Sequence, residues 1–167
     1  MGIYIALGAN LGDRRANLTK ALQHLEPDVH VEAVSALYES PPQAPAPPPA
    51  YLNAACRVST ALEPQALLAY LKRIEREMGR ENAERWAPRP IDLDIALYND
   101  SLVDEGDLVI PHPRIGERAF VLRPLLDLDP ELTHPATGER LADLLAKLGE
   151  EGLVQVADTS WHSLQNW

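Results

Sequence analysis

Cysteine, phenylalanine and long apolar runs are nearly absent from this chain of 167 residues. The only cysteine, Cys56, excludes a disulfide within the chain and any cluster of thiolate metal ligands, and its apolar surroundings in the sequence indicate a small core residue. The sequence has no run of about 18 apolar residues, which a membrane-spanning helix requires, and no charged leader precedes the first apolar segment. We therefore expect a cytoplasmic protein.

Positive charge is also scarce. The chain has 15 lysine and arginine residues against 25 aspartate and glutamate residues, which gives a formal net charge of −10. Nucleic acids and anionic membranes both require a positive surface, so neither is expected as the main partner. Any phosphate binding must depend on a few local arginines. The length suffices for one core but not for two ordinary domains, and we expect a single, monomeric domain over residues 1–167.

The most informative segment is residues 85–95, which read RWAPRPIDLDI. Apolar and polar residues alternate from Ile91 to Tyr98, as a half-buried β-strand requires. Asp92 and Asp94 therefore point the same way, with Cα atoms about 6–7 Å apart. Two such carboxylates can share Mg²⁺, which keeps several waters and binds substrate phosphates in its remaining positions. The alternation places Ile91, Leu93, Ile95 and Leu97 on the core face, and Asp92, Asp94, Ala96 and Tyr98 on the other face.

An amphipathic edge strand with a solvated face is the simpler explanation of two aspartates two positions apart. Aspartate is disfavoured in strands, however, and two like charges side by side destabilise a strand unless a cation lies between them. Arg85 and Arg89 precede the pair and offer planar, permanently charged donors that suit phosphate oxygens. The segment therefore favours a site for a metal ion and a polyphosphate.

The spacing of apolar residues predicts two strand-helix-strand units. In chain order we expect a strand over 3–7, a helix that ends before Pro27, strands over 29–38 and 51–62, a helix from Pro64 to Gly79, strands over 92–98 and near 102–103, a helix over 141–148 and a strand over 153–156. Residues 120–126 fit a strand or a helix, residues 41–50 hold six prolines and cannot pair in a central sheet, and the tail after 157 gives no signal. This order is typical of an α+β sandwich with a ferredoxin-like βαββαβ core, a mainly antiparallel sheet and additional C-terminal strands and a helix.

Six segments together resemble one known family. They are residues 1–10 with the turn Gly8-Ala9-Asn10, residues 38–42 (YESPP), 51–55 (YLNAA), 85–95, 110–114 (IPHPR) and 117–125 (ERAFVLRPL). In this order and spacing they are similar to the 6-hydroxymethyl-7,8-dihydropterin pyrophosphokinase family, over roughly residues 1 to 150. The resemblance implies the same ferredoxin-like fold. It also implies transfer of pyrophosphate from ATP to the hydroxymethyl group of the pterin in folate biosynthesis, with two Mg²⁺ ions as cofactor.

The resemblance also implies the roles of individual residues. The pterin residues would be Ser40, Pro41, Gln43, Tyr51, Asn53, Trp86 and Phe120, with Tyr51 and Phe120 on the two ring faces. The ATP residues would be Glu75, Arg80, Arg89, Ile95, His112 and Arg118. Asp92 and Asp94 would hold both metal ions, and the catalytic set would be Arg80, Arg89, Asp92 and Asp94. The loops over residues 39–50 and 80–90 would close over the site and exclude water.

The same residues have simpler explanations when the resemblance is set aside. Phe120 is then a core residue, Tyr51 and Asn53 lie on a solvated sheet face, His112 is structural, and charge pairing within a helix explains Glu75. The chain also departs from the family where Asn82 stands in a loop shortened by one residue, where Lys72 replaces a glutamine and where Gln43 replaces an aliphatic residue.

Two other functions remain open from the sequence. One is a Mg²⁺-dependent phosphotransferase with another acceptor. The other is a non-catalytic nucleotide- or RNA-binding ferredoxin-like module, which would need exposed aromatic residues on the sheet and a basic rim. The acidic charge and the paired aspartates argue against this second function.

Overall fold

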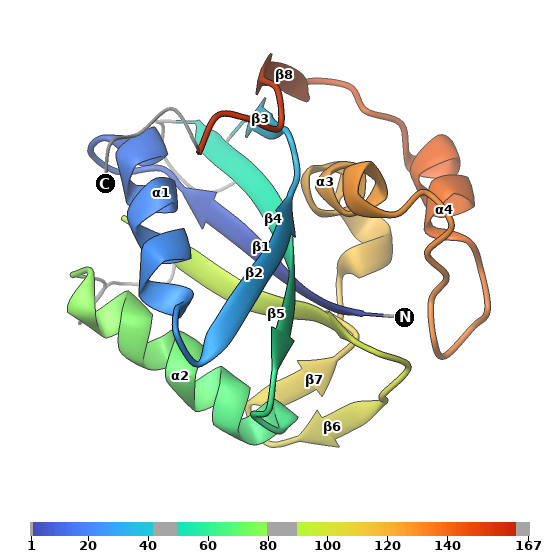
Figure 1. Ribbon diagram of the computed structural model, residues 1–167. Coiled ribbons are helices and arrows are strands. Elements are labelled where there is room, and N and C mark those ends of the chain that lie inside the picture. The colour runs from blue at the N-terminus through green and yellow to red at the C-terminus, as the bar shows by residue number, and fades with distance from the viewer. Residues whose placement is uncertain (1, 42–49, 80–89, 163–167) are drawn as a thin grey trace.

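The protein folds around an antiparallel sheet whose strands differ in length, with helices on both faces (Figure 1). The computed structural model describes residues 2–41, 50–79 and 90–162. In the described part of the chain the sheet has six strands in the order β5-β1-β4-β3-β8, and β2 also pairs with β4. The strands are β1 (Ile3–Ala9), β2 (Val29–Val34), β3 (Leu37–Ser40), β4 (Tyr51–Thr60), β5 (Asp92–Tyr98) and β8 (Val154–Ala157).

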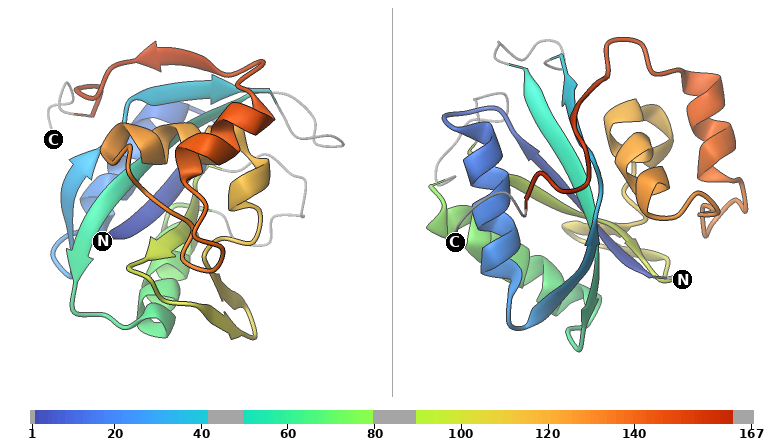
Figure 2. Two further views of the ribbon diagram at one scale, coloured as in Figure 1. Left: turned by 90° about the vertical axis from the view of Figure 1, so that its right-hand side faces the viewer. Right: turned by 45° about the horizontal axis from the view of Figure 1, so that its top comes forward.

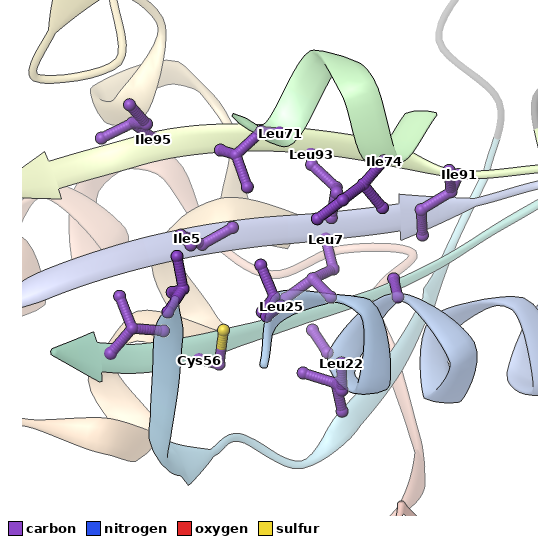
Figure 3. Packing of buried hydrophobic residues seen from close by; sticks show 14 of the residues in the cluster. Ile5, Leu7, Leu22, Leu25, Cys56, Leu71, Ile74, Ile91, Leu93 and Ile95 are labelled. Carbon is purple, nitrogen blue, oxygen red and sulfur yellow. The ribbon is translucent and has the colours of Figure 1, made fainter. Parts of the chain in front are cut away.

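Two helices cover the first face of the sheet, α1 (Arg14–Leu25) and α2 (Pro64–Glu77). Asp13 begins α1, because its Oδ1 accepts the N–H of Ala16 at 3.1 Å and so satisfies one of the free donors of the first turn. Pro64 opens α2, where its missing N–H has no cost. The first core lies between these helices and the sheet (Figure 3), and includes Ile5, Leu7, Leu22, Leu25, Cys56, Leu71, Ile74 and Leu93.

A second pair of helices covers the opposite face (Figure 2). They are α3 (Ala119–Leu128) and α4 (Leu141–Leu148), and the short 3₁₀ helix η1 (Ile115–Glu117) leads into α3. Strands β6 (Val103–Glu105) and β7 (Leu108–Ile110) form a separate hairpin. The second core contains Tyr4, Leu97, Leu122, Leu125, Leu141 and Leu145. No helix among the described residues is long and apolar enough to cross a membrane.

The predicted ferredoxin-like α+β fold is confirmed, two local predictions need correction, and residues 120–126, which fitted a strand or a helix, form a helix. Residues 29–38 do not form one strand, because the chain breaks at Ser35 and Ala36 between β2 and β3. At the break, the Ser35 hydroxyl replaces a main-chain acceptor and binds the N–H of Ala55 at 2.9 Å. Residues 120–126 belong to α3, which contains Pro124 in its interior.

The face assignment of β5 is right up to Ala96 and wrong for Leu97 and Tyr98. Ile5 pairs with Ile95 and Tyr4 with Leu97, so Ala96 is an extra residue in β5. Such a bulge reverses the side-chain alternation of all the residues that follow it. Leu97 therefore packs in the second core beside Tyr4, whereas Tyr98 packs against the first. Asp92 and Asp94 precede the bulge and keep their predicted face.

The C-terminal segment contributes a core residue that the sequence did not indicate. Trp161 is fully buried in the first core, and its Nε1 donates to the Ser35 carbonyl at 2.9 Å. Arg15 of α1 donates to the Trp161 carbonyl at 3.0 Å. The segment after β8 thus fills the place where β2 and β3 separate.

Candidate active site

The candidate site begins on the sheet face that α3 partly covers. Gly8 of β1 pairs with Asp92 on one side and with Asn53 on the other, and Ala6 pairs with Asp94 and with Ala55. Directly paired residues of antiparallel strands share a face, so the two aspartates and Asn53 lie on the same side of the sheet. Between them lie Gly8 and Ala6 of β1, whose small size leaves this part of the face without large side chains.

Gly8 has no side chain, and it lies in the middle of the row formed by Asp92, Gly8 and Asn53. A Cβ at this position would meet the Tyr51 ring at 3.5 Å and the Asn53 Oδ1 at 3.7 Å. No side chain therefore projects from position 8, between the aspartates on β5 and Tyr51 and Asn53 on β4. A substrate lying across β1 could contact both ends, which a larger residue at position 8 would obstruct.

His112 faces the aspartate end of the site. Its main-chain N–H donates to the Ala96 carbonyl at 3.0 Å, and its Nδ1 accepts the N–H of Arg114 at 3.1 Å. Nδ1 is therefore an acceptor, so the proton of the neutral ring lies on Nε2, which is 3.9 Å from Asp94 Oδ2. Burial, and then the charge of Arg118, lower the pKa of His112 below its usual value, which favours the neutral ring with an Nε2–H donor directed into the site.

Arg118 precedes the first residue of α3 and lies between the acidic and the aromatic groups. Its guanidinium carbon is 5.5 Å from the centre of the Phe120 ring. Burial lowers the pKa of Arg118 most strongly, Arg114 lowers it further, and Asp94 and Asp92 oppose both effects. An arginine stays charged under such a shift, so Arg118 supplies a positive charge close to the two carboxylates.

The other end of the row holds the predicted pterin residues of β3 and β4. Asn53 is buried, and its Nδ2 donates to the Ser40 hydroxyl at 2.8 Å and to the Tyr38 carbonyl at 3.4 Å. Tyr51 is half-buried and Pro41 is exposed. Phe120 is half-buried at the start of α3, which packs against β4. The structure thus brings Ser40, Tyr51 and Asn53 together, with Phe120 on the helix above their strand.

Glu75 and Ile95 lie on the opposite face from this site. Glu75 is only 2% exposed, and its Oε2 accepts the N–H of Leu93 at 2.7 Å. Leu93 stands between Asp92 and Asp94, so Glu75 fixes the main chain that carries the aspartate pair. Lys72, 3.5 Å from Glu75 Oε1, supplies the pairing charge within α2. The side chain of Ile95 is buried in the first core, so a nucleotide contact there would have to use the main chain.

One supporting contact has no signal in the sequence. The Tyr38 hydroxyl donates to Asp127 Oδ2 at 2.6 Å, and Arg123 NH2 lies 3.4 Å from Asp127 Oδ1. Asp127 is in α3, so this network holds the helix that begins beside Phe120 against β3. Only the tertiary packing brings these residues together. Gln43, Arg80, Arg85, Trp86 and Arg89, and most of the two loops expected to close, lie outside the described residues.

The aspartate pair fits Mg²⁺ by the nature of its ligands. Both carboxylates are partly exposed on one sheet face, with 43% exposure for the Asp94 side chain. Among the described residues there is no group of three or more histidine, cysteine, aspartate or glutamate side chains that could hold a metal ion. Two oxygen ligands with room for water and phosphate suit Mg²⁺ better than a metal that needs a complete cage of protein ligands.

A family model described as 7,8-dihydro-6-hydroxymethylpterin-pyrophosphokinase matches residues 4–130. The chain belongs to this family. It is 43% identical over 153 residues to a 2-amino-4-hydroxy-6-hydroxymethyldihydropteridine pyrophosphokinase of Pseudomonas aeruginosa, covering 90% of this chain and 94% of that protein. The enzyme of the same name from Methylorubrum extorquens is 41% identical over 155 residues, covering 92% of this chain and 97% of its own length.

Other relatives are much longer. A folic acid synthesis protein of Pneumocystis carinii is 41% identical over 155 residues, and this chain spans only 21% of its length. The crystal structure of the wild-type Plasmodium falciparum HPPK-DHPS protein with pteroate superimposes with a TM-score of 0.72 at 18% identity, over 87% of this chain and 42% of that one. At this identity the superposition supports the shared fold alone.

Proposed function

We propose that this chain transfers the pyrophosphoryl group of ATP to 6-hydroxymethyl-7,8-dihydropterin, in folate biosynthesis, and releases AMP. The hydroxymethyl oxygen attacks the β-phosphorus, the bond between that phosphorus and the oxygen bridging to the α-phosphate breaks, and AMP leaves with the bonding electrons. The hydroxymethyl proton passes to solvent. The main support for the proposal is one face of the sheet. On this face Asp92 and Asp94 lie on one side of Gly8, and Tyr51 and Asn53 lie on the other.

The nucleotide would bind at the aspartate end. Arg118 supplies a positive charge, and the neutral His112 supplies an Nε2–H donor for a phosphate oxygen. Arg80 and Arg89 would add charge to this set, and the main chain of Ile95 would add a contact. The buried Glu75 would support nucleotide binding indirectly, because it holds Leu93 between Asp92 and Asp94. Asp92 and Asp94 would hold two Mg²⁺ ions, which when bound would neutralise phosphate charge. Positioning and charge neutralisation dominate such reactions, so a strong general base is not required.

The pterin would bind at the other end of the row. The pterin ring has aromatic faces and a polar edge, so it needs stacking partners and a few in-plane hydrogen-bonding groups. Tyr51 and Phe120 would provide the faces and Asn53 the amide. The main chain at Ser40 and Pro41 would reach the ring edge, and Gln43 and Trp86 would complete the pocket. Asn53 is already oriented by its bond to Ser40, which lowers the cost of ordering it in the complex.

The proposal is tested by AMP formation from ATP and Mg²⁺, measured with and without 6-hydroxymethyl-7,8-dihydropterin. AMP should accumulate only when the pterin is present. ATP consumption that does not depend on the pterin, or that requires a different alcohol, would contradict the proposed acceptor. We further infer a single-domain monomer over residues 1–167 that needs no nucleic acid, and light scattering during size-exclusion chromatography would detect any larger assembly.

A further inference from the structure

One arginine outside the site joins the two strands that carry the pterin residues. Arg14 is the first residue of α1, and its NH1 donates to the Ala50 carbonyl at 2.9 Å. The same nitrogen lies 2.9 Å from Glu39 Oε2. Glu39 belongs to β3, and Ala50 directly precedes β4. A single guanidinium nitrogen therefore connects both strands at the end where residues 41–50 link them.

This contact lies next to the last pair of the β3-β4 ladder. Ser40 pairs with Tyr51, and beyond this pair the register of the two strands ends. Strand ends open easily because few contacts hold them. The side chains of Arg14 and Glu39 are 27% and 40% exposed, so the ion pair alone would stabilise the fold only slightly. The position of this ion pair matters more than its strength, because it restrains a strand end that carries residues proposed to bind the pterin.

We propose that Arg14 is a positioning residue for pterin binding, which it supports by holding Ser40, Pro41 and Tyr51 in place before the substrate arrives. This inference rests on the proposed function. Groups that are ordered before binding lose less conformational entropy in the complex, so their ligand binds more tightly. The aspartate end of the site lies on β5, across β1 from this contact, so ATP binding should depend little on Arg14.

Four variants, among them Arg14→Lys as a partial rescue, separate a positioning role of Arg14 from an effect on general stability. Arg14→Ala removes both contacts, whereas Glu39→Gln removes the opposite charge and leaves the bond to the Ala50 carbonyl. Arg15→Ala is the matched control: it removes the neighbouring arginine of the same helix, which donates to the Trp161 carbonyl and contacts neither strand end among the described residues. The measurements are the KM values for pterin and ATP, kcat, pterin affinity by calorimetry and the melting temperature.

Arg14→Ala should raise the KM and the Kd for the pterin about three- to tenfold, the range that corresponds to the net contribution of one ordinary hydrogen bond, with the KM for ATP nearly unchanged. Glu39→Gln should give a smaller change in the same direction, and Arg14→Lys should restore part of the affinity because an ammonium group can donate to both partners. Arg15→Ala should lower the melting temperature and leave the KM for the pterin unchanged.

The inference is overturned if Arg14→Ala binds the pterin as the wild type does, or if the KM values for pterin and ATP rise together. A wild-type chain that forms no AMP with the pterin would instead overturn the proposed function, and the inference with it. Wild-type activity combined with an unchanged pterin KM in Arg14→Ala would overturn the inference alone.

Discussion

The aspartate pair of β5 is costly for the fold, because two carboxylates on one face of a strand repel each other. Asp94→Ala should lower kcat by about 10²–10³-fold, the effect expected from loss of one group that stabilises charge in the transition state. The melting temperature without Mg²⁺ should stay the same or rise. Steady-state kinetics and thermal unfolding test this together. Near-normal turnover of the variant at millimolar Mg²⁺ would exclude the two-metal assignment.

Phe120 is the aromatic residue that the proposal places on one face of the pterin. Phe120→Ala should weaken pterin binding by about 1–3 kcal/mol, by analogy with bases stacked on aromatic side chains. Binding of a non-hydrolysable ATP analogue should change much less. Calorimetry with each ligand measures both effects, and circular dichroism checks that the overall helix content is unchanged. A larger loss for the nucleotide than for the pterin would reject this role.

Some single residues could be predicted from the sequence and others could not. The shared face of Asp92 and Asp94 follows from strand alternation, as does that of Tyr51 and Asn53. The bond from Leu93 to Glu75 depends on how α2 packs beside β5, and no local pattern encodes it. The roles of the predicted site residues stay predictions until ligands are tested.

Between elements, Glu75 links α2 to the strand of the aspartate pair. Glu75→Ala would leave the buried N–H of Leu93 without this acceptor, which should lower the free energy of unfolding by about 1–3 kcal/mol. Glu75→Gln retains an acceptor oxygen and should cost less. Urea unfolding of the two variants gives the comparison. If both variants lower the free energy of unfolding equally, the charge of Glu75 accounts for its contribution to stability and the hydrogen bond to Leu93 does not.

The order of helices and strands could be predicted from the sequence, but the bulge in β5 and the break between β2 and β3 could not. Helical spacing and the end signals Pro64 and Gly79 define α2 well, and Gly79 has the positive φ of 94° that a residue after a helix often adopts. The bulge at Ala96 and the break at Ser35 depend on pairing with strands that are distant in sequence, β1 for Ala96 and β4 for Ser35. Residues 120–126 were ambiguous because a short apolar run fits a buried strand and a buried helix equally well.

Across the whole molecule, Trp161 joins the C-terminal segment to the first core. Trp161→Ala should lower the free energy of unfolding by about 3–5 kcal/mol, because it leaves a large cavity between α1 and the sheet. Trp161→Phe should cost less, since it keeps most of the packing and loses the bond to the Ser35 carbonyl. Chemical denaturation measures both values. A variant Trp161→Ala as stable as the wild type would show that the segment does not contribute to the core.

The same segment should make stability depend on pH. Burial lowers the pKa of His162 below its usual value, so the unfolded chain binds the proton more readily than the folded chain. The contribution of His162 is therefore fully present above the ordinary histidine pKa, about 6.5, and is lost as the pH falls through the lower folded value. Unfolding free energies between about pH 5 and 8 should fall less steeply on acidification in His162→Asn than in the wild type. Equal slopes would contradict the assignment.

In the proposed reaction, pyrophosphate moves as one unit from ATP to a pterin. The most direct test follows two samples of ATP, one labelled at the β-phosphate and one at the γ-phosphate, through reaction with 6-hydroxymethyl-7,8-dihydropterin and Mg²⁺. If pyrophosphate moves as one unit, both labels should reach the pterin product in equal amounts and one AMP should form for each product molecule. Transfer of the γ-label alone with formation of ADP, or retention of both labels in the nucleotide, would contradict it.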